Sequence, residues 1–387
     1  MNRKPMIIRS GMTRRQFLAR SGALGAAGLS LPALLAACGG GESFNLFFEN
    51  WTLYIDPTEE GVDGAEGTVG TVDRFIEATG LKMKYTDAYN DNNEYFAKIQ
   101  PLLGAGKTID PDIIAPTSWM AGRLINLGWT EKLPLSDIPN AANLDDGFKN
   151  PTWDPTGEYS LPWQAGMAGV AYNSDATGRE IKSVADLFDP AFKGKIGMLS
   201  EMRDTIGLIL MGEGIDPSTI STFEEAAPAF EKLEKAKADG QIRAFTGNDY
   251  TDDLLKGDFA ACVGWSGDVV QLSAENEKVK FVIPEEGGTR WADVMVIPKG
   301  AKNVANAAKW MNFVYDPEQA AQITTWVTYV SPVKGVREII AASDPALAEN
   351  PLVFPDEATS NRLRAFAQLS EEEEIKFDEA FSSIIGA

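Results

Sequence analysis

The stretch SFNLFFENWTLYI, residues 43–55, decides the fold, because it predicts a buried strand that opens an alternation of strands and helices. The segments that continue this alternation, in the order helix, strand, helix, strand, helix, are 71–80, 81–88, 92–106, 111–116 and 118–128. Such a pattern predicts an open, mostly parallel α/β sheet, and ligands of such sheets lie beyond the carboxyl ends of the strands. The segments WTLYI and PTSWM leave two of those ends.

The chain of 387 residues is long enough for two domains, and a turn-rich segment at 150–166, NPTWDPTGEYSLPWQAG, is expected to be the crossover between them. Strands are expected at 169–173, at 194–200, at the end of 251–265 and as a pair within 279–300. Helices are expected at 183–190, 201–214, 222–240, the start of 251–265, 303–316 and 317–329. The run of four glutamates at 371–374 is expected to form the solvated face of a helix.

The N-terminus carries an export signal. Residues 1–37 hold six basic residues and no acidic residue, followed by an Ala, Leu and Gly run too short and too Gly-rich for a comfortable membrane span. The run TRRQFLAR, with Arg14 and Arg15, matches the twin-arginine signal, and LAAC, ending at Cys38, resembles the lipobox of bacterial lipoproteins. We therefore expect cleavage before Cys38, a lipid on that residue, and a linker at 38–43.

The net charge excludes one class of ligand. The chain has 35 basic and 56 acidic residues, a net charge of −21, and removal of residues 1–37 leaves 29 basic residues and a net charge of −27. Nucleic-acid binding needs clustered Lys and Arg, so no nucleic acid is expected. The charge suits a cationic ligand, although acidity can also serve solubility alone.

Histidine and cysteine counts remove several chemistries. The sequence contains no His, which excludes Ser-His-Asp and Cys-His nucleophilic catalysis and nearly every zinc enzyme. If Cys38 is lipidated, Cys262 is the only Cys left, so no intramolecular disulfide and no Cys-based metal site are expected. Cys262 lies in the apolar run FAACVGW and is expected to be a small buried hydrophobe. No metal and no cofactor are expected.

Eight landmarks in order carry a resemblance to a known family. They are NWTLYI (50–55), APTSW (115–119), YSLPWQAGMAGVAYN (159–173), DLFDPAFKGKIGML (186–199), EMRD (201–204), CVGWSGD (262–268), PEEGGTRWADVMVIPKGAKN (284–303) and WVTYVSPV (326–333). With these landmarks the chain resembles, over almost its whole mature length, the periplasmic solute-binding proteins of polyamine transporters, the spermidine/putrescine-binding kind.

The resemblance implies a two-lobed type II periplasmic binding protein that closes by hinge bending at strands crossing between the lobes. Lobe 1 is expected at 44–160 and 293–327, and lobe 2 at 161–292 and 328–387. The implied function is capture of spermidine or putrescine outside the cytoplasmic membrane and delivery to the permease and ATPase of an ABC importer. The protein is expected to be a monomer, to catalyse nothing, and to stay lipid-anchored in the periplasm or at the cell surface.

By resemblance, position by position, the ligand-binding residues are Trp51, Thr52, Tyr54, Thr117, Trp119, Glu201, Asp204, Trp265, Trp291, Asp293 and Tyr329. Thr117 and Trp119 stand where the family has a Ser and a Tyr, and the acids of EMRD come in the order Glu, Asp instead of Asp, Glu. The family's C-terminal Gln contact has no secure counterpart, and Gln368 is a weak candidate. Glu49 and Asp87 lie near strand ends without an assigned role.

The chemistry of a polyamine explains these residue types. Such a ligand is a flexible aliphatic chain with an ammonium at each end, so its site must place flat rings along the methylenes and carboxylates at the ends. Glu201 and Asp204, three apart, share a helix face, where a cation or the helix N-terminus itself could hold two like charges. Each Trp taken alone would more often belong to a core.

Four alternatives remain open at the level of sequence. A secreted glycoside hydrolase also needs two carboxyl groups and no His, but it leaves the landmarks unexplained. A binding protein of this fold could instead carry a sugar or ferric iron, although iron would usually call for paired Tyr, anions or His. An amino acid needs an Arg for its carboxylate, and Arg203 or Arg290 could supply one.

Overall fold

The computed structural model describes residues 44–59, 67–149 and 151–386, and its strands form one sheet. The strands are β1 (Leu46–Trp51), β2 (Met83–Tyr89), β3 (Ile113–Ile114), β4 (Ser160–Asn173), β5 (Ile196–Leu199), β6 (Ile242–Thr246), β7 (Ala261–Trp265), β8 (Val279–Val282), β9 (Gly288–Val296) and β10 (Leu363–Arg364). Within the described chain their order is β2-β1-β3-β9-β4-β7-β5-β6, with β10 beside β9 and β8 beside β4.

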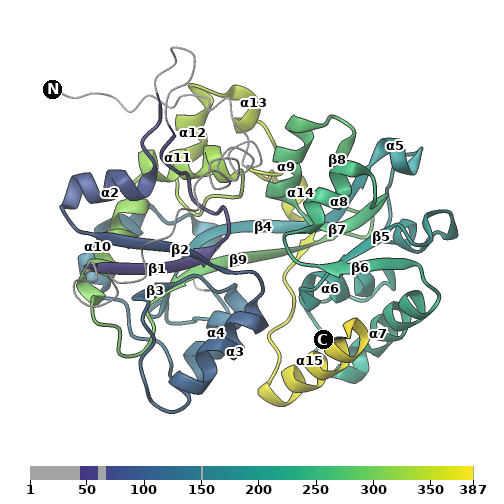
Figure 1. The fold of residues 1–387 in the computed structure, drawn as a ribbon, viewed down its shortest axis with the longest axis horizontal. Helices are drawn as coiled ribbons and strands as arrows, with labels where there is room; N and C mark the ends of the chain where they lie inside the picture. Colours follow the sequence, from purple (N-terminus) through teal and green to yellow (C-terminus); the bar gives the residue numbers. More distant parts are fainter. Residues whose placement is uncertain (1–43, 60–66, 150, 387) are drawn as a thin grey trace, which may run out of the picture.

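Helices cover this sheet in two groups, one around each end (Figure 1). They are α2 (Thr71–Thr79), α3 (Asn92–Leu103), α4 (Ser118–Asn126), α5 (Ser174–Thr177), α6 (Met202–Gly212), α7 (Phe223–Ala238), α8 (Tyr250–Lys256), α9 (Ser266–Glu275), α10 (Val304–Val314), α11 (Pro317–Val327), α12 (Val336–Ala341), α13 (Pro345–Ala348), α14 (Glu357–Ser360) and α15 (Glu371–Ile385). Short 3-10 helices are η1 (Leu135–Asp137), η2 (Pro139–Asn143), η3 (Asp146–Phe148), η4 (Val184–Phe188) and η5 (Pro190–Phe192). The six elements expected for the first part of the chain are all present.

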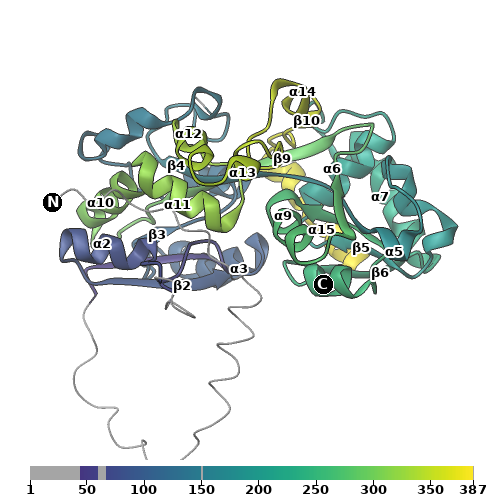
Figure 2. The ribbon, with the colours of Figure 1, turned by 90° about the horizontal axis from the view of Figure 1, so that it is seen from above.

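Two long strands join the lobes. β4 pairs with β9 from Ser160 to Ala168 and with β7 from Ala168 to Tyr172, so one strand passes from the first lobe into the second. Figures 1 and 2 show β4 and β9 crossing between the two groups of helices. The parallel prediction holds for β1 with β2 and β3, and for β5 with β6 and β7. In contrast, β4 is antiparallel to β7, β8 and β9, and β9 is antiparallel to β3 but parallel to the short β10. The turn-rich crossover is shorter than expected, because Ser160–Gly166 already belongs to β4.

The first lobe has a core on each face of its part of the sheet. On one face, α2, α10 and α11 pack around fully buried Trp310, Phe48 and Phe75. On the other face, α3 and α4 pack through Phe96, Leu124 and their neighbours against β9. These two cores fix the carboxyl end of β1 and the N-terminus of α4, which both face the second lobe.

The second lobe has one large core around β5 and β7, which contains Ile196, Phe259 and Cys262. Cys262 is fully buried, as predicted, and burial raises the pKa of its thiol well above the usual range. The lobe division differs from the expected one after residue 327. Val333–Ala348 returns to the first core, because α11 and α12 pack on each other, and the chain contributes to the second core again from Leu369.

The C-terminal helix α15 belongs to the second lobe through Phe377, Phe381 and Ile384. Ser370 caps its N-terminus by accepting from the backbone N–H of Glu373. The run of four glutamates is therefore helical, as predicted, but the prediction of a solvated face is wrong for Glu373 and Glu374, which are buried. The chain before α15 runs between the two lobes in Figure 1.

The export signal with Arg14 and Arg15, the acylation site Cys38 and the linker at 38–43 lie outside the described residues. In the part of the chain that is described, no helix combines the length and apolarity needed to cross a membrane.

Candidate functional site

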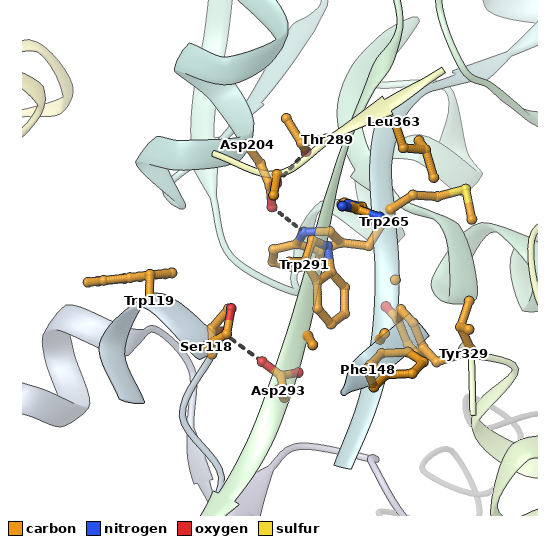
Figure 3. A pocket seen from close by; sticks show the side chains of 18 of the residues that line it. Ser118, Trp119, Phe148, Asp204, Trp265, Thr289, Trp291, Asp293, Tyr329 and Leu363 are labelled. Carbon is orange, nitrogen blue, oxygen red and sulfur yellow. Dashed lines mark hydrogen bonds between the residues drawn. The ribbon is translucent and has the colours of Figure 1, made fainter. Parts of the chain in front are cut away.

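One cavity of about 910 Å³ lies between the lobes, and all eleven side chains implied for ligand binding line it. Figure 3 shows part of this cavity. The eleven are Trp51, Thr52, Tyr54, Thr117, Trp119, Glu201, Asp204, Trp265, Trp291, Asp293 and Tyr329. The fold thus brings together residues from both lobes that are up to 278 positions apart, since Trp51 and Tyr329 bound the set.

The strand β9 supplies a row of three side chains to this cavity. Thr289, Trp291 and Asp293 are spaced by two, so they share one face of the strand. At a rise of about 3.3 Å per residue, Thr289 and Asp293 lie about 13 Å apart along the strand. Figure 3 shows the Trp291 ring between Asp204, which is bonded to Thr289, and Asp293. Two carboxyl groups therefore stand at the two ends of an indole ring.

Asp293 is a buried acid held by neutral donors. Its Oδ1 accepts a hydrogen bond from Thr117 Oγ1 over 2.7 Å, and Tyr54 donates a second. The Thr117 hydroxyl accepts in turn from Asn92 Nδ2 over 2.9 Å. Burial raises the pKa of Asp293 to about 7, and the two hydrogen bonds offset only part of that rise. An incoming cation would stabilise the ionised form of this group.

Asp204 is held in a similar way from the second lobe. Trp265 Nε1 donates to its Oδ2 over 2.8 Å, and Thr289 Oγ1 donates to its Oδ1 over 2.6 Å. Burial raises the pKa of Asp204, and these two hydrogen bonds lower it in part. Each oxygen of the Asp204 carboxylate therefore accepts a hydrogen bond from a neutral group, and neither of these two donors carries a positive charge.

Glu201 combines two roles that the sequence treated as rivals. It is the N-cap of α6, since its Oε1 accepts from the backbone N–H of Arg203 over 3.3 Å, and it also lines the cavity. Asn92 Nδ2, from the first lobe, donates to its other oxygen over 3.3 Å. Burial raises the pKa of Glu201 to about 8; Arg203 lowers it in part and Asp204 raises it further. The helix N-terminus thus holds Glu201 and Asp204 side by side.

Two glycines leave room for the rings of Trp291 and Tyr329, which form part of an aromatic wall of the cavity. A Cβ on Gly166 would lie 2.5 Å from Trp291 Cζ2 and 3.0 Å from Tyr329 Cδ1. A Cβ on Gly267 would lie 2.6 Å from three atoms of the Tyr329 ring. The rings of Trp291 and Tyr329 contact each other with centroids 5.5 Å apart. Their positions therefore depend on the absence of side chains beneath them.

The segment WTLYI forms the first-lobe part of this wall. Trp51 donates from Nε1 to the carbonyl of Ala115 over 2.7 Å, and its ring packs on Tyr89. Tyr54 meets Tyr329 edge-on, with ring centroids 5.4 Å apart. Leu53, between them in the chain, has φ of 55°, a backbone conformation that costs energy for a non-glycine residue. Such strain is typical of binding loops.

Trp119 lies on the cavity in a way that the resemblance does not imply. The Arg203 guanidinium lies 3.5 Å from the centroid of its ring, so one face of the indole is covered by a protein cation. Arg203 is buried, and its Nη2 donates to Glu374 Oε1 over 3.1 Å. Its Nε and Nη1 have no hydrogen-bond partner among the described residues.

Several cavity residues were not among the expected set. Asp268, three positions after Trp265, accepts from Tyr329 Oη over 3.0 Å and from Tyr250 Oη over 3.1 Å. Its signal was present in the landmark CVGWSGD, which ends on it. Asn92 carried no such signal, because its role depends on Thr117 and Glu201 meeting it in space.

The weaker candidates divide into two groups. Gln368 and Arg290 line the cavity and are exposed. Glu49 and Asp87 do not line it: Glu49 accepts from Tyr95 Oη over 2.5 Å, and Asp87 accepts from the backbone N–H of Leu53 over 3.5 Å. Glu49 and Asp87 thus support the first lobe instead of the cavity.

The arrangement is suited to an organic cation. Four of the carboxyl groups that line the cavity, from Glu201, Asp204, Asp268 and Asp293, share its walls with the six tryptophan and tyrosine rings of the expected set. Among the residues that the structure describes, no group of three His, Cys, Asp or Glu side chains is placed to hold a metal ion. Rings beside carboxylates provide both cation–π and charge-assisted contacts.

Comparison with known protein families assigns the chain to one of them. The model of the family described as "Bacterial extracellular solute-binding protein" matches residues 70–355. The "Spermidine/putrescine-binding periplasmic protein" of Escherichia coli (strain K12) is 26% identical over 326 residues, which are 84% of this chain and 87% of that protein. The "Putrescine-binding periplasmic protein PotF" of the same organism is 27% identical over 354 residues, 85% of this chain and 88% of that protein.

Solved structures agree on the architecture. A protein of Listeria monocytogenes has a TM-score of 0.76 at 26% identity, covering 88% of this chain and 98% of that one. The spermidine/putrescine ABC transporter substrate-binding protein PotD of Streptococcus pneumoniae has a TM-score of 0.71 at 25% identity, with coverage of 88% and 98%. The prediction of a two-lobed periplasmic binding protein fold is therefore confirmed, and the chain belongs to the family of bacterial extracellular solute-binding proteins.

Proposed function

We propose that this protein captures a polyamine, spermidine or putrescine, in the cavity between its lobes and delivers it to an ABC importer. One observation carries the proposal: buried carboxyl groups from both lobes face one cavity with raised pKa values and lie beside aromatic rings. Such groups are stabilised by a ligand that brings positive charge at more than one point.

The energetics favour the carboxyl groups as the deciding contacts. A ring face contributes up to about 2 kcal/mol to a desolvated cation, whereas an unpaired buried charge costs several kcal/mol. Asp204 at one end of Trp291 and Asp293 at the other would each pair with an ammonium, and Glu201, which lines the same cavity, would add a third carboxylate. The methylene chain between the ammoniums would lie along Trp291 and Tyr329.

The relatives support the same substrate class. The Escherichia coli proteins are named for spermidine and putrescine, and each covers more than four fifths of this chain. We therefore propose that the eleven cavity residues bind the ligand, with Asp268 as a twelfth. By the same reasoning the protein acts by binding and not by catalysis.

The cellular setting follows from the relatives and the N-terminus. The relatives are periplasmic proteins, and we propose that this one is exported through its Arg14–Arg15 signal and held at the membrane by a lipid on Cys38. It would present its closed form, as a monomer, to the permease and ATPase subunits of the importer. We propose that closure is a hinge motion of β4 and β9, the strands shared by both lobes.

Calorimetric titration tests the proposal. Acyl-free protein that begins at residue 39 is titrated with putrescine, spermidine and spermine, and with glutamate and maltose as comparison ligands. We expect micromolar or tighter binding of at least one polyamine. Folded protein that binds none of the three would overturn the substrate assignment and leave the fold unaffected.

Variants test the site itself. Glu201→Gln combined with Asp293→Asn should abolish polyamine binding, because the ligand loses two of the buried carboxylates that line the cavity. Glu49→Gln is the matched control, since Glu49 is a carboxylate of the first lobe that does not line the cavity. Unchanged affinity in the double variant would remove the site assignment.

A second candidate ligand is an amino acid with a terminal ammonium. It is favoured by Arg203, which is buried on the cavity with Nε and Nη1 unpartnered among the described residues. A ligand carboxylate could accept from those groups. The Glu374 contact and the Trp119 ring already engage this guanidinium, so we place the polyamine first.

A further inference from the structure

A second set of charged contacts joins the lobes beside the cavity. Arg123, on α4 of the first lobe, lies 3.9 Å from a Glu374 oxygen and 3.6 Å from an Asp378 oxygen. Both acids are on α15 of the second lobe, four residues apart, so they share one face of that helix. Asn93, at the start of α3, adds a hydrogen bond to Asp378.

These contacts continue to the ligand site through Arg203. Its Nη2 lies 3.1 Å from Glu374, and its guanidinium covers the ring of Trp119, which lies four residues before Arg123 on α4. The backbone N–H of Arg203 also donates to Glu201. The chain of contacts therefore starts on α4, crosses to α15, passes through α6 and returns to α4.

The helices α4 and α15, which these contacts join, are anchored in the cores of different lobes. Met120, Ala121 and Leu124 anchor α4 in a first-lobe core. Phe377 and Phe381 anchor α15 in the second-lobe core. A hinge motion that separates the lobes must therefore break the contacts of Arg123 with α15 and of Arg203 with Trp119.

The charges of the set are balanced and partly shielded from water. Two guanidinium groups face two carboxylates, and the side chains of Arg203 and Glu374 are 7% and 9% exposed. Arg123 and Asp378, at 21% and 25%, lie nearer to solvent. When one member of a shielded set is removed, its partner is left without compensation, so these contacts favour the closed arrangement only as a complete set.

We infer that Arg123, Glu374 and Asp378 are positioning residues that hold the lobes closed around the ligand and hold Arg203 against Trp119. The inference rests on the proposed function for its ligand, but its effect on closure does not depend on which ligand is bound. The C-terminal helix α15 thereby contributes to ligand affinity, although Glu374 is its one residue that lines the cavity.

The test compares Arg123→Gln and Asp378→Asn with Glu371→Gln, an exposed acid on the same helix. Rates of spermidine association and dissociation are measured by stopped flow. We expect dissociation to become about three- to tenfold faster in both variants, because the lost contacts hold the lobes together around the bound ligand. The control should match the unmodified protein.

A charge-swapped variant separates positioning from folding. Arg123→Asp with Asp378→Arg restores an opposite-charge pair and should recover part of the slow dissociation. Asp378 is partly exposed, so Asp378→Asn should keep the fold, which a circular dichroism melt verifies. Dissociation rates equal to those of the unmodified protein in Arg123→Gln and Asp378→Asn would overturn the inference.

A second readout works without any ligand. Fluorescent labels on Leu127→Cys, after α4, and Glu231→Cys, on α7, report the distance between the lobes, while the native Cys262 is fully buried. Loss of Arg123 or Asp378 should shift ligand-free molecules toward longer label distances. An unchanged distance distribution would overturn the inference. If the unmodified protein binds no polyamine, the proposed function fails, and this distance measurement alone decides the role of α15.

Discussion

The indole Nε1 of Trp265 donates a hydrogen bond to Asp204 Oδ2 over 2.8 Å, so a ring and an acid of the cavity are fixed to each other. Thr289 donates to the other oxygen of the same carboxylate. The orientation of Asp204 is therefore set by the protein before any ligand enters, which lowers the entropic cost of binding.

The first prediction concerns this hydrogen bond. Trp265→Phe keeps an aromatic ring but removes the donor, so Asp204 loses orientation and one stabilising contact. A hydrogen bond to a charged group contributes about 1.5–3 kcal/mol, and we expect polyamine affinity to fall about tenfold or more. Calorimetric titration measures the change. Trp129→Phe, in the first-lobe core and away from the cavity, is the control and should bind normally.

The second prediction concerns the glycine beneath the aromatic wall. Gly166→Ala adds a Cβ that would lie 2.5 Å from Trp291, so the Trp291 and Tyr329 rings must move. We expect at least a tenfold loss of polyamine affinity, because the rings no longer flank the ligand chain. Gly212→Ala, which meets Val184 in the second-lobe core, should lower the melting temperature without a comparable loss of affinity. Equal affinity losses in the two variants would contradict the wall assignment.

The third prediction concerns ligand length. Asp204 is tied to Thr289, and Thr289 lies about 13 Å from Asp293 along β9. A triamine reaches further along this row than a diamine, so we expect spermidine to bind more tightly than putrescine. Asp293→Asn should reduce spermidine affinity more than putrescine affinity, since only the longer ligand engages both ends. Titration of the same variant with both ligands decides the point; an equal loss for both would contradict it.

The sequence predicted the parts of this site that lie in continuous motifs. The strand ending in WTLYI, the acids of EMRD and the row of RWAD were all recognisable because neighbouring residues in the chain carry the signal. Asn92 was not recognisable, because its two partners, Thr117 and Glu201, come from different lobes. The covering of Trp119 by Arg203 was missed for the same reason.

The lobe boundary and the burial of Glu374 were also beyond local reasoning. An acidic run is usually solvated, and only the approach of Arg123 and Arg203 makes burial of this glutamate tolerable. The Pro and Gly residues before residue 166 are typical of turns, so they concealed the start of β4, which depends on pairing with β9. The burial of Glu374 and the start of β4 both depend on partners that are distant in the sequence.

The last prediction is a pH dependence of stability and binding. Glu201 and Asp293 have pKa values raised by burial to about 8 and about 7, from ordinary values of 4.5 and 3.8. Asp56, also buried, has its pKa raised to about 6. These groups hold more protons in the folded state than in the unfolded state between about pH 4 and pH 8, so the free energy of unfolding of the ligand-free protein decreases as pH rises through that window.

Acids whose pKa is lowered, such as Asp186, act at lower pH, since the stability they contribute is already complete above about pH 4. We therefore expect the melting temperature of ligand-free protein to fall from pH 5 to pH 8, and the fall to be smaller in Glu201→Gln and Asp293→Asn. A polyamine favours the ionised carboxylates, so its binding should release protons and its affinity should rise over the same range. Titrations in two buffers of different ionisation enthalpy count those protons. Proton uptake on binding, or a melting temperature that rises with pH, would contradict the assignment of Glu201 and Asp293 as the acids that meet the ligand.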